Sequence, residues 1–236
     1  MPDSSPMVTP AQRKWLPWLT AVGFFMQTLD GTILNTALPS MAEALGESPL
    51  QMQSVIIAYM LTVALLIPAS GWLADRFGTR RVYLVAILLF TLGSLACAIA
   101  NTLPMLVIAR VLQGVGGALL MPIGRLAVLR VYSKHELLRV MSFVTIPGLL
   151  GPLIGPALGG WLVEVASWHW VFLINLPVGL LGFVASWHFM PDLRQHTARF
   201  DWQGFVLFSV GMVLVSVGLQ GLGEHSISTG WALFAV

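Results

Sequence analysis

Charged residues are scarce in this chain. Only 9% of its 236 residues are Asp, Glu, Lys or Arg, whereas 57% are hydrophobic. Because soluble domains carry about 25% charged residues, this balance excludes an ordinary soluble core. The mean hydropathy is +0.84, and the apolar segments run for roughly 20 residues each, the length of a membrane-spanning helix. The sequence therefore predicts an all-α polytopic membrane protein and not a membrane barrel, whose strands alternate over about 10 residues.

Cysteine, basic clusters and metal-ligand spacings are equally scarce. The single Cys97 excludes an intramolecular disulfide framework. The net charge is +2 with no basic block, which argues against nucleic acid as a partner. The Cys and His residues show no ligand spacing, so we expect no metal and no other cofactor. The sequence contains neither a phosphate-binding loop nor a nucleophile–base pair beside a plausible pocket, which argues against an ATP-driven pump and against an enzyme.

The apolar segments divide the chain into predicted helices. These cover residues 15–38, 53–73, 82–100, 104–123, 140–163, 171–189, 202–219 and 231–236. The resulting organisation is an N-terminal tail at 1–14, a six-helix bundle at 15–190, a connector at 191–201, and a seventh helix with the start of an eighth at 202–236. The last segment is shorter than the about 20 residues that span a membrane. This favours the N-terminal portion of a longer transporter over a complete eight-helix protein.

Basic residues are concentrated on alternate connectors. Eleven of the twelve Lys and Arg residues lie near the N-terminus or between the second and third, fourth and fifth, or sixth and seventh predicted helices. Cytoplasmic loops of membrane proteins carry this excess of positive charge. The pattern predicts a multi-pass protein of the cytoplasmic (inner) membrane with a cytoplasmic N-terminus.

Two ionisable residues, Asp30 and Arg110, lie inside predicted helices. A charged side chain at membrane depth costs about 2.5–3.5 kcal/mol on insertion scales, and such residues usually serve a function. Counted from Pro39 and Pro104 at the outer helix ends, the two residues lie about 13 and 9 Å deep. We predict that they couple through a hydrogen bond, a water molecule or a shared proton network. The alternative is a purely structural buried ion pair.

Further polar residues accompany this pair. Gln27, Thr32 and Asn35 lie on the helix of Asp30, and Gln113 lies one turn after Arg110. So many polar groups do not suit a helix that faces lipid, and they predict a substrate cavity. The alternative is hydrogen bonding between helices, which Gln and Thr commonly make.

Glycine and proline are concentrated in the fifth predicted helix. Gly148, Gly151, Gly155 and Gly159 share one stripe, and small residues at this spacing let helices approach closely. Pro152, Pro156 and Gly160 lie among them, and proline interrupts the hydrogen-bond ladder of a helix. The segment predicts either a packing motif or a helix that bends during gating.

Six motifs resemble signatures of the major facilitator superfamily and of its 14-helix drug:proton antiporter branch. They are LDGTILNTALP (29–39), GWLADRFGTRR (71–81), LVIARVLQGVGGA (106–118), GPLIGPALGG (151–160), the stretch from Trp168 to Pro177 with Phe172, Ile174 and Asn175, and RFDWQG (199–204). Two positions depart from the usual pattern: Ser142 replaces the first glycine of the long helix 5 signature, and His169 stands where the branch often has Arg.

The resemblance implies a fold of two six-helix bundles with two linker helices, the bundles rocking about a midplane site. It implies that Asp30 and Arg110 couple protons, and that the fifth helix supplies antiporter packing through Gly151, Pro152, Gly155, Pro156, Gly159 and Gly160. It also implies a cytoplasmic gate at Gly71, Asp75, Arg76, Gly78, Arg80 and Arg81, where charge alone would indicate only a membrane anchor.

The expected function is export of amphipathic, drug-like compounds by alternating access, driven by the proton gradient and without a cofactor. The expected partners are the lipid bilayer, the substrate, protons and the C-terminal half of the transporter, and the sequence indicates no envelope-spanning partner. Two alternatives remain. One is an exporter of an endogenous metabolite such as an amino acid, siderophore or sugar derivative, and the other is a truncated or non-transporting interaction protein on the same scaffold.

Overall fold

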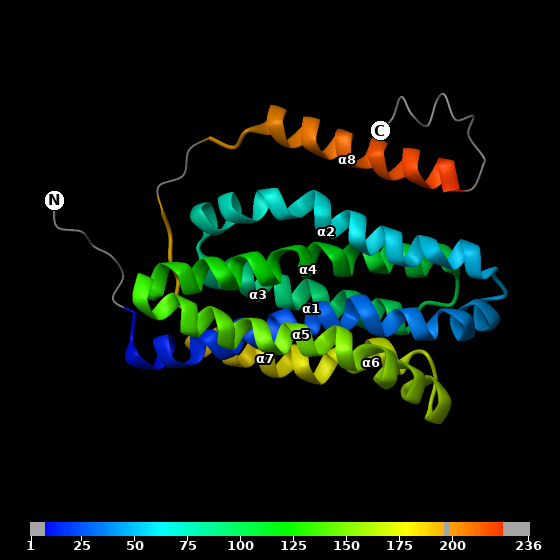
Figure 1. Ribbon diagram of the computed structural model, residues 1–236, viewed down its shortest axis with the longest axis horizontal. Helices are drawn as coiled ribbons and strands as arrows, with labels where there is room; N and C mark the ends of the chain where they lie inside the picture. The colour runs from blue at the N-terminus through cyan, green and yellow to red at the C-terminus, as the bar shows by residue number, and fades with distance from the viewer. Residues whose placement is uncertain (1–7, 196–198, 224–236) are drawn as a thin grey trace. The chain divides into compact units, whose positions relative to one another are not determined.

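The computed structural model describes residues 8–195 and 199–223, and every regular element in these ranges is a helix. The predicted all-α class is therefore confirmed. The helices are α1 (Pro10–Leu45), α2 (Pro49–Phe77), α3 (Thr79–Ala98), α4 (Leu103–Val131), α5 (Lys134–Val165), α6 (Trp170–Leu173), α7 (Asn175–Phe189) and α8 (Trp202–Gly223) (Figure 1). The predicted start of an eighth membrane helix, residues 231–236, lies outside the described residues.

The chain forms two compact units, residues 1–197 and 198–236. The second unit contains α8, which begins where predicted, after Asp201. The Asp201 carboxylate accepts a hydrogen bond of 2.9 Å from the amide of Gly204 and so satisfies one free N–H group of the first turn. All other helices belong to the first unit.

Helix α1 is longer than predicted at both ends. It begins at Pro10, inside the expected tail, because Thr9 and Gln12 form a capping box that satisfies the first free amides. It also continues through Pro39 to Leu45, where Gly46 adopts a φ of 68° and ends it. Met41 and Ala42, beyond the proline, are buried at 0% and 3% exposure. Tertiary packing, the main source of helix stability in proteins, thus outweighs the hydrogen bond that Pro39 removes.

The basic connector between the fourth and fifth predicted helices is itself mostly helical. Helix α4 ends only at Val131, and α5 begins at Lys134. Ser133 and Glu136 form another capping box, which fixes the start of α5. Arg125 and Arg130 therefore extend from α4 and not from a loop.

The sixth predicted helix is interrupted after Leu173, which gives the short α6 and the longer α7. Pro177 explains the interruption, since it has no N–H group to donate to the carbonyl of Leu173 four residues earlier. The break places Asn175 at the first position of α7, where it is 2% exposed.

Two apolar clusters fill the first unit. One contains Leu16, Tyr83, Phe90 and Ile123, and the other contains Ile33, Met41, Val55, Leu106 and Phe172. Along α4, Arg110 lies between the two clusters, and along α1, Asp30 lies near the place where they meet. The bundle core is therefore apolar towards both ends and polar in the middle.

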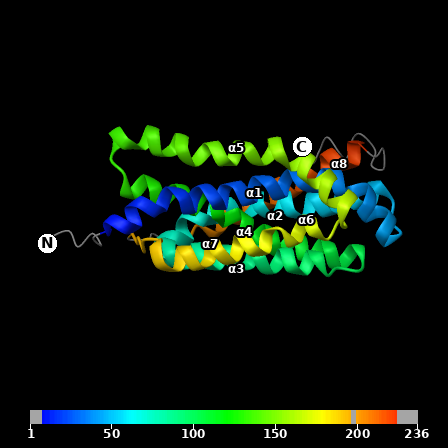
Figure 2. The same cartoon turned by 90° about the horizontal axis from the view of Figure 1, so that it is seen from below.

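Helix α5 runs alongside α1 (Figures 1 and 2). A Cβ atom at Gly151, Gly155 or Gly159 would approach the hydroxyl oxygen of Thr28, Thr32 or Thr36, respectively, to 2.3–2.4 Å. Each step of four residues along α5 is matched by a step of four residues in the same direction along α1, so the two helices are parallel. In contrast, Pro152, Pro156 and Gly160 are exposed. Gly148 is buried as well, and a Cβ there would meet the Phe24 ring of α1. The four glycines of the predicted stripe therefore form the packing face, whereas the two prolines and Gly160 lie on an exposed face.

Within the described residues, five helical segments are long and apolar enough to cross a membrane. They are Pro49–Phe77, Thr79–Ala98, Leu103–Val131, Lys134–Val165 and Trp170–Phe189. Helix α1, at 36 residues, is longer than any of them but carries the polar residues around Asp30, which lower its hydropathy. Of these polar residues, Asp30 is buried and Thr32 reaches α5, whereas Asn35 and Thr36 are exposed.

The α1–α5 contact predicts opposite results for two adjacent glycines. A Cβ at Gly159 would lie 2.5 Å from the backbone oxygen of Ile33, whereas one at Gly160 would meet nothing within 4 Å. We expect Gly159→Ala to lower the stability of the full-length protein by about 1–3 kcal/mol, the usual cost of overpacking. Gly160→Ala is the matched control and should leave the thermal unfolding midpoint unchanged or slightly raised. Equal midpoints for the two variants would contradict the close packing.

Candidate functional site

The structure brings Asp30 of α1 and Arg110 of α4 into direct contact. The Arg110 Nη1 and Asp30 Oδ2 atoms are 2.6 Å apart, and each side chain is 1% exposed. Eighty positions separate the residues in sequence. Two opposite charges that lie at similar depths in the bundle thus form a fully buried ion pair.

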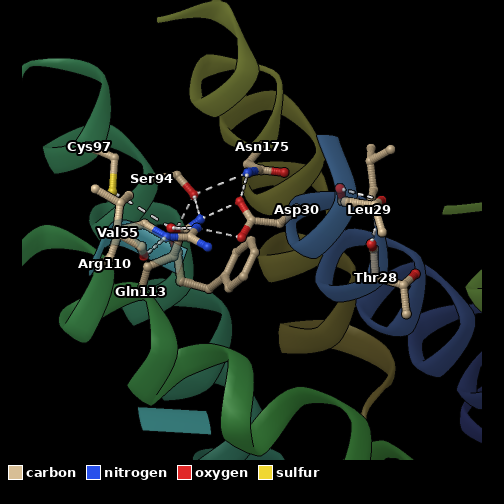
Figure 3. A network of polar contacts seen from close by, with 11 residues as sticks. Thr28, Leu29, Asp30, Val55, Ser94, Cys97, Arg110, Gln113 and Asn175 are labelled. Carbon is tan, nitrogen blue, oxygen red and sulfur yellow. Dashed lines mark hydrogen bonds and ion pairs between the residues drawn. The ribbon is translucent and has the colours of Figure 1, made fainter. Parts of the chain in front are cut away.

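A hydrogen-bond network surrounds the pair (Figure 3). Gln113 donates through Nε2 to Asp30 Oδ1 at 2.7 Å and to Ser94 Oγ at 2.8 Å, and its Oε1 accepts from Arg110 at 2.6 Å. Asn175 donates through Nδ2 to Asp30 Oδ1 at 3.1 Å and lies 3.3 Å from Ser94 Oγ. The carboxylate therefore accepts hydrogen bonds from three different side chains. This matters because a buried ion pair is stable only when its remaining hydrogen-bonding groups are also satisfied.

Arg110 has further partners on α2. Its Nε donates to the backbone oxygen of Val55 at 3.4 Å, and its guanidinium carbon lies 4.0 Å from the centre of the Tyr59 ring. A cation over an aromatic face in a desolvated site gains about 2 kcal/mol. The guanidinium thus contacts the Asp30 carboxylate, the oxygens of Gln113 and Val55, and the Tyr59 ring. Together, the residues of this site come from α1, α2, α3, α4 and α7.

Three residues of this site carry no role in the sequence prediction: Tyr59, Ser94 and Asn175. Asn175 lies inside a motif that resembles the antiporter branch, so the sequence did contain a signal for it. Ser94 and Tyr59 are single polar groups in apolar helices, and neither spacing nor charge distinguishes them from ordinary core residues. Their positions follow only from helix packing.

The four predicted cavity residues do not gather in one place. Gln113 is 0% exposed and belongs to the ion-pair network. Thr32 donates to the backbone oxygens of Thr28, Leu29 and Gly151, so its hydroxyl lies at the α5 contact. Asn35 is exposed and Gln27 is half-buried. The polar residues that were predicted to share one cavity therefore lie in different surroundings.

The predicted gate residues surround the turn between α2 and α3. Asp75 accepts a hydrogen bond from Arg130 at the end of α4, and Arg80 donates to the backbone oxygen of Trp187. Gly78 has a φ of 91°, a conformation that favours glycine. Arg76 and Arg81 are exposed, and a Cβ at Gly71 would meet no atom within 4 Å.

The segment after α7, residues 191–195, is hydrogen-bonded to the turn between α2 and α3. Thr79 donates through its hydroxyl to the oxygen of Pro191 at 2.7 Å, and the amide of Leu193 donates back to the same hydroxyl at 3.0 Å. The amide of Thr79 donates to the oxygen of Leu193 at 3.2 Å. Arg130 reaches Gln195 at 3.2 Å while it holds Asp75. Residues 191–195 are thus an ordered clamp across α2, α3 and α4.

The first turn of α1 is fixed at the same end of the bundle. Arg13 pairs with Glu136 at 2.6 Å, and the Tyr132 hydroxyl donates to the Arg13 backbone oxygen. Burial raises the pKa of the Tyr132 phenol above its ordinary value, so the phenol stays a hydrogen-bond donor at neutral pH. Helix α1 is therefore anchored to the turn between α4 and α5.

These features define a helical membrane bundle with one charged pair sealed in its middle and a clamped turn at its basic end. The family model of the Major Facilitator Superfamily matches residues 20–203. The match covers more than half of the chain, and the chain belongs to this superfamily. It is accordingly a multi-pass membrane protein.

Two of the curated relatives that the chain matches have the same name. The chain is 58% identical to the "Putative multidrug resistance protein MdtD" of Pectobacterium atrosepticum, over 91% of this chain and 46% of the relative. It is 56% identical to the protein of that name from Klebsiella pneumoniae subsp. pneumoniae, over 94% of this chain and 47% of the relative. The chain thus spans about half the length of the curated relatives it matches.

Solved structures support the fold. A peptide transporter POT in complex with sulfate gives a TM-score of 0.66 at 20% identity, covering 95% of this chain and 48% of that one. A POT family transporter in complex with 5-aminolevulinic acid gives the same TM-score at 19% identity, covering 93% and 49%. The predicted major facilitator fold is confirmed.

The clamp predicts different results for two threonines. Thr79→Val removes the donor to Pro191 and leaves the amide of Leu193 without its acceptor, which should destabilise the protein by about 1–3 kcal/mol. Thr91→Val is the matched control, because the Thr91 hydroxyl is buried without a hydrogen-bond partner among the described residues. Thermal unfolding and amide hydrogen exchange at Leu193 measure the difference. Unchanged exchange at Leu193 in Thr79→Val would contradict the clamp.

Proposed function

We propose that this chain is the N-terminal portion of a proton-coupled secondary exporter of amphipathic, drug-like compounds. The observation that carries the proposal is the Asp30–Arg110 pair, a carboxylate and a guanidinium that are both 1% exposed in the middle of the bundle. Buried ionisable residues in membrane helices commonly belong to proton or substrate pathways. The name of the curated relatives supports export of drug-like compounds, and membership of the superfamily supports alternating access.

The proton acts on the charge balance of the pair. Protonation of Asp30 neutralises the carboxylate, while Arg110 stays charged because a guanidinium does not lose its proton in proteins. Arg110 then keeps the Gln113 and Val55 oxygens and the Tyr59 ring, all of which lie on α4 or α2. The bond that weakens is therefore the one between α1 and α4. Proton uptake thus loosens α1 and leaves Arg110 held where it is.

Access to Asp30 requires helix movement. The carboxylate is 1% exposed and is bonded to side chains of α4 and α7, so a proton reaches it only when α1 separates from one of these helices. Thr28, Thr32 and Thr36 fit against the glycines of α5, which makes α1 and α5 a natural moving pair. We propose that this pair moves, so that Asp30 is protonated from outside and deprotonated from the cytoplasm.

The turn between α2 and α3 is the proposed cytoplasmic gate. Asp75 is already held by Arg130, and the exposed Arg76 and Arg81 are free to contact the rest of the transporter. Gly71, which has no atom near its Cβ position, leaves space for such a contact. Closure of this turn would latch the cytoplasmic side while the transporter faces outward.

Proton coupling is tested with Asp30→Asn in the full-length protein, reconstituted into liposomes. An imposed inward proton gradient drives efflux of a fluorescent amphipathic dye, and pyranine reports the accompanying proton flux. The neutral amide cannot cycle a proton, so gradient-driven efflux and proton flux should both fall at least tenfold. Coupled transport at the wild-type rate would refute the role of Asp30.

A second variant separates coupling from folding. Asp30→Asn leaves a buried charge without its partner, which typically costs 3–5 kcal/mol. The charge-balanced double variant Asp30→Asn/Arg110→Gln removes both charges and should recover much of that stability, measured by thermal unfolding. Its gradient-driven efflux should still be lost. Recovery of efflux together with stability would show that the pair is only structural.

Orientation is tested by cysteine labelling in intact cells. Asn101→Cys, in the turn between α3 and α4, should react with a membrane-impermeant maleimide added from outside. His135→Cys, at the exposed start of α5, should react only after the cells are opened. The native Cys97 is 0% exposed and supplies no background. The reverse pattern would refute a cytoplasmic N-terminus.

A further inference from the structure

A second polar site lies between α1, α4 and α5, apart from the ion-pair network. A cavity of about 290 Å³ is lined by Thr20, Phe24, Met121, Arg125, Met141, Val144 and Thr145. Its walls are mostly apolar, and two methionines give flexible surfaces that adapt to ligands of different shape. One full charge, Arg125, lies at its edge.

Arg125 has no acidic partner among the described residues. Each described carboxylate at this end of the first unit is already engaged by another arginine: Asp75 by Arg130, Glu136 by Arg13 and Asp192 by Arg194. The four ion pairs of the described residues leave Arg125 out. Arg125 is exposed, and it therefore gives the edge of the cavity a positive charge that no described carboxylate pairs with.

The threonines of the cavity do not compete with Arg125 as donors. The Thr20 hydroxyl donates to the backbone oxygen of Leu16, and the Thr145 hydroxyl donates to that of Met141. Both hydroxyl protons are thus used within helices, which leaves oxygen lone pairs as acceptors. The one free set of strong donors belongs to the guanidinium, whose planar fork matches a carboxylate, sulfonate or phosphate.

The cavity is separate from Asp30 along the bundle. Arg125 lies fifteen residues after Arg110 on α4, about 22 Å along the helix axis, towards the basic end. The Thr20 hydroxyl, which lines the cavity, lies 3.4 Å from the backbone oxygen of Gly124, so α1 and α4 are in contact beside the cavity. None of the described residues that line the cavity belongs to the ion-pair network.

We propose that this cavity binds amphipathic anions, with the acidic group on Arg125 and the apolar body against Phe24, Met121 and Met141. The proposal rests on the export function proposed above and narrows its substrate class to compounds that carry a negative charge. An anion is favoured over a cation because the cavity offers one fixed positive charge and no described carboxylate. It is favoured over an inorganic ion because most of the lining is apolar.

The test measures equilibrium binding to the full-length protein in lipid nanodiscs at equal pH on both sides, so it requires no proton coupling. Two radiolabelled probes of nearly identical size are compared, 1-naphthaleneacetate, which is an anion, and 1-naphthaleneacetamide, which is neutral. Arg125→Gln should weaken binding of the anion about tenfold, the loss expected for one charge-assisted hydrogen bond. Binding of the neutral amide should not change, and Arg125→Lys should retain part of the anion preference.

The control is Arg139→Gln, since Arg139 is an exposed arginine of α5 that does not line the cavity. It should bind both probes as the wild type does. An equal loss of both probes in Arg125→Gln would overturn the proposal, because it would indicate that Arg125 holds an acidic side chain elsewhere in the transporter. Unchanged binding of the anion in Arg125→Gln would also overturn the proposal. It would indicate that Arg125 only helps to set the orientation of the protein in the membrane. The binding assay does not depend on proton coupling, so a negative result of the Asp30 experiment would not change how the binding results are interpreted.

Discussion

The contact between Asp30 and Arg110 constrains the whole first unit, because neither charge is tolerated in the middle of the bundle without the other. The pair needs Gln113, Ser94 and Asn175 as well, since a carboxylate that accepts too few hydrogen bonds would still be strongly destabilising. Five helices therefore have to meet at one level. The apolar clusters on either side supply most of the packing, but the polar layer between them determines which helices face each other.

The polar layer and the basic end of the bundle are stabilised in different ways. In the middle, α1 contacts its neighbours through the carboxylate of Asp30, which is bonded to Arg110, Gln113 and Asn175. At the basic end, neutral hydrogen bonds through Thr79 and Leu193 hold the segment after α7 on the turn after α2. A bundle built this way is held by neutral bonds at one end and by an ionisable contact in its middle, which is the arrangement that the proposed rocking mechanism uses.

Much of the fold followed from the sequence, since helices that cross a membrane need a fixed apolar length and basic loops alternate. The approach of Asp30 to Arg110 followed from their depths, and the glycine stripe of α5 from its spacing. Helix ends were less predictable. Continuation through Pro39 depends on the burial of Met41, and the helical start of α5 on a capping box inside a charged stretch. The roles of Ser94 and Tyr59, and the clamp at residues 191–195, arise only from tertiary contacts and leave no periodic signal.

The polar face of α1 also has a consequence for biosynthesis. Asp30 enters the membrane long before its partner is made, since Arg110 follows 80 residues later and the contact of Thr32 with Gly151 spans 119 residues. At a synthesis rate of about 5–20 residues per second, α1 waits roughly 4–16 s for α4. Throughout that interval its carboxylate lacks the guanidinium that later neutralises it. Helix α1 thus depends on the insertion machinery, or on water at the bilayer surface, until the fourth helix arrives.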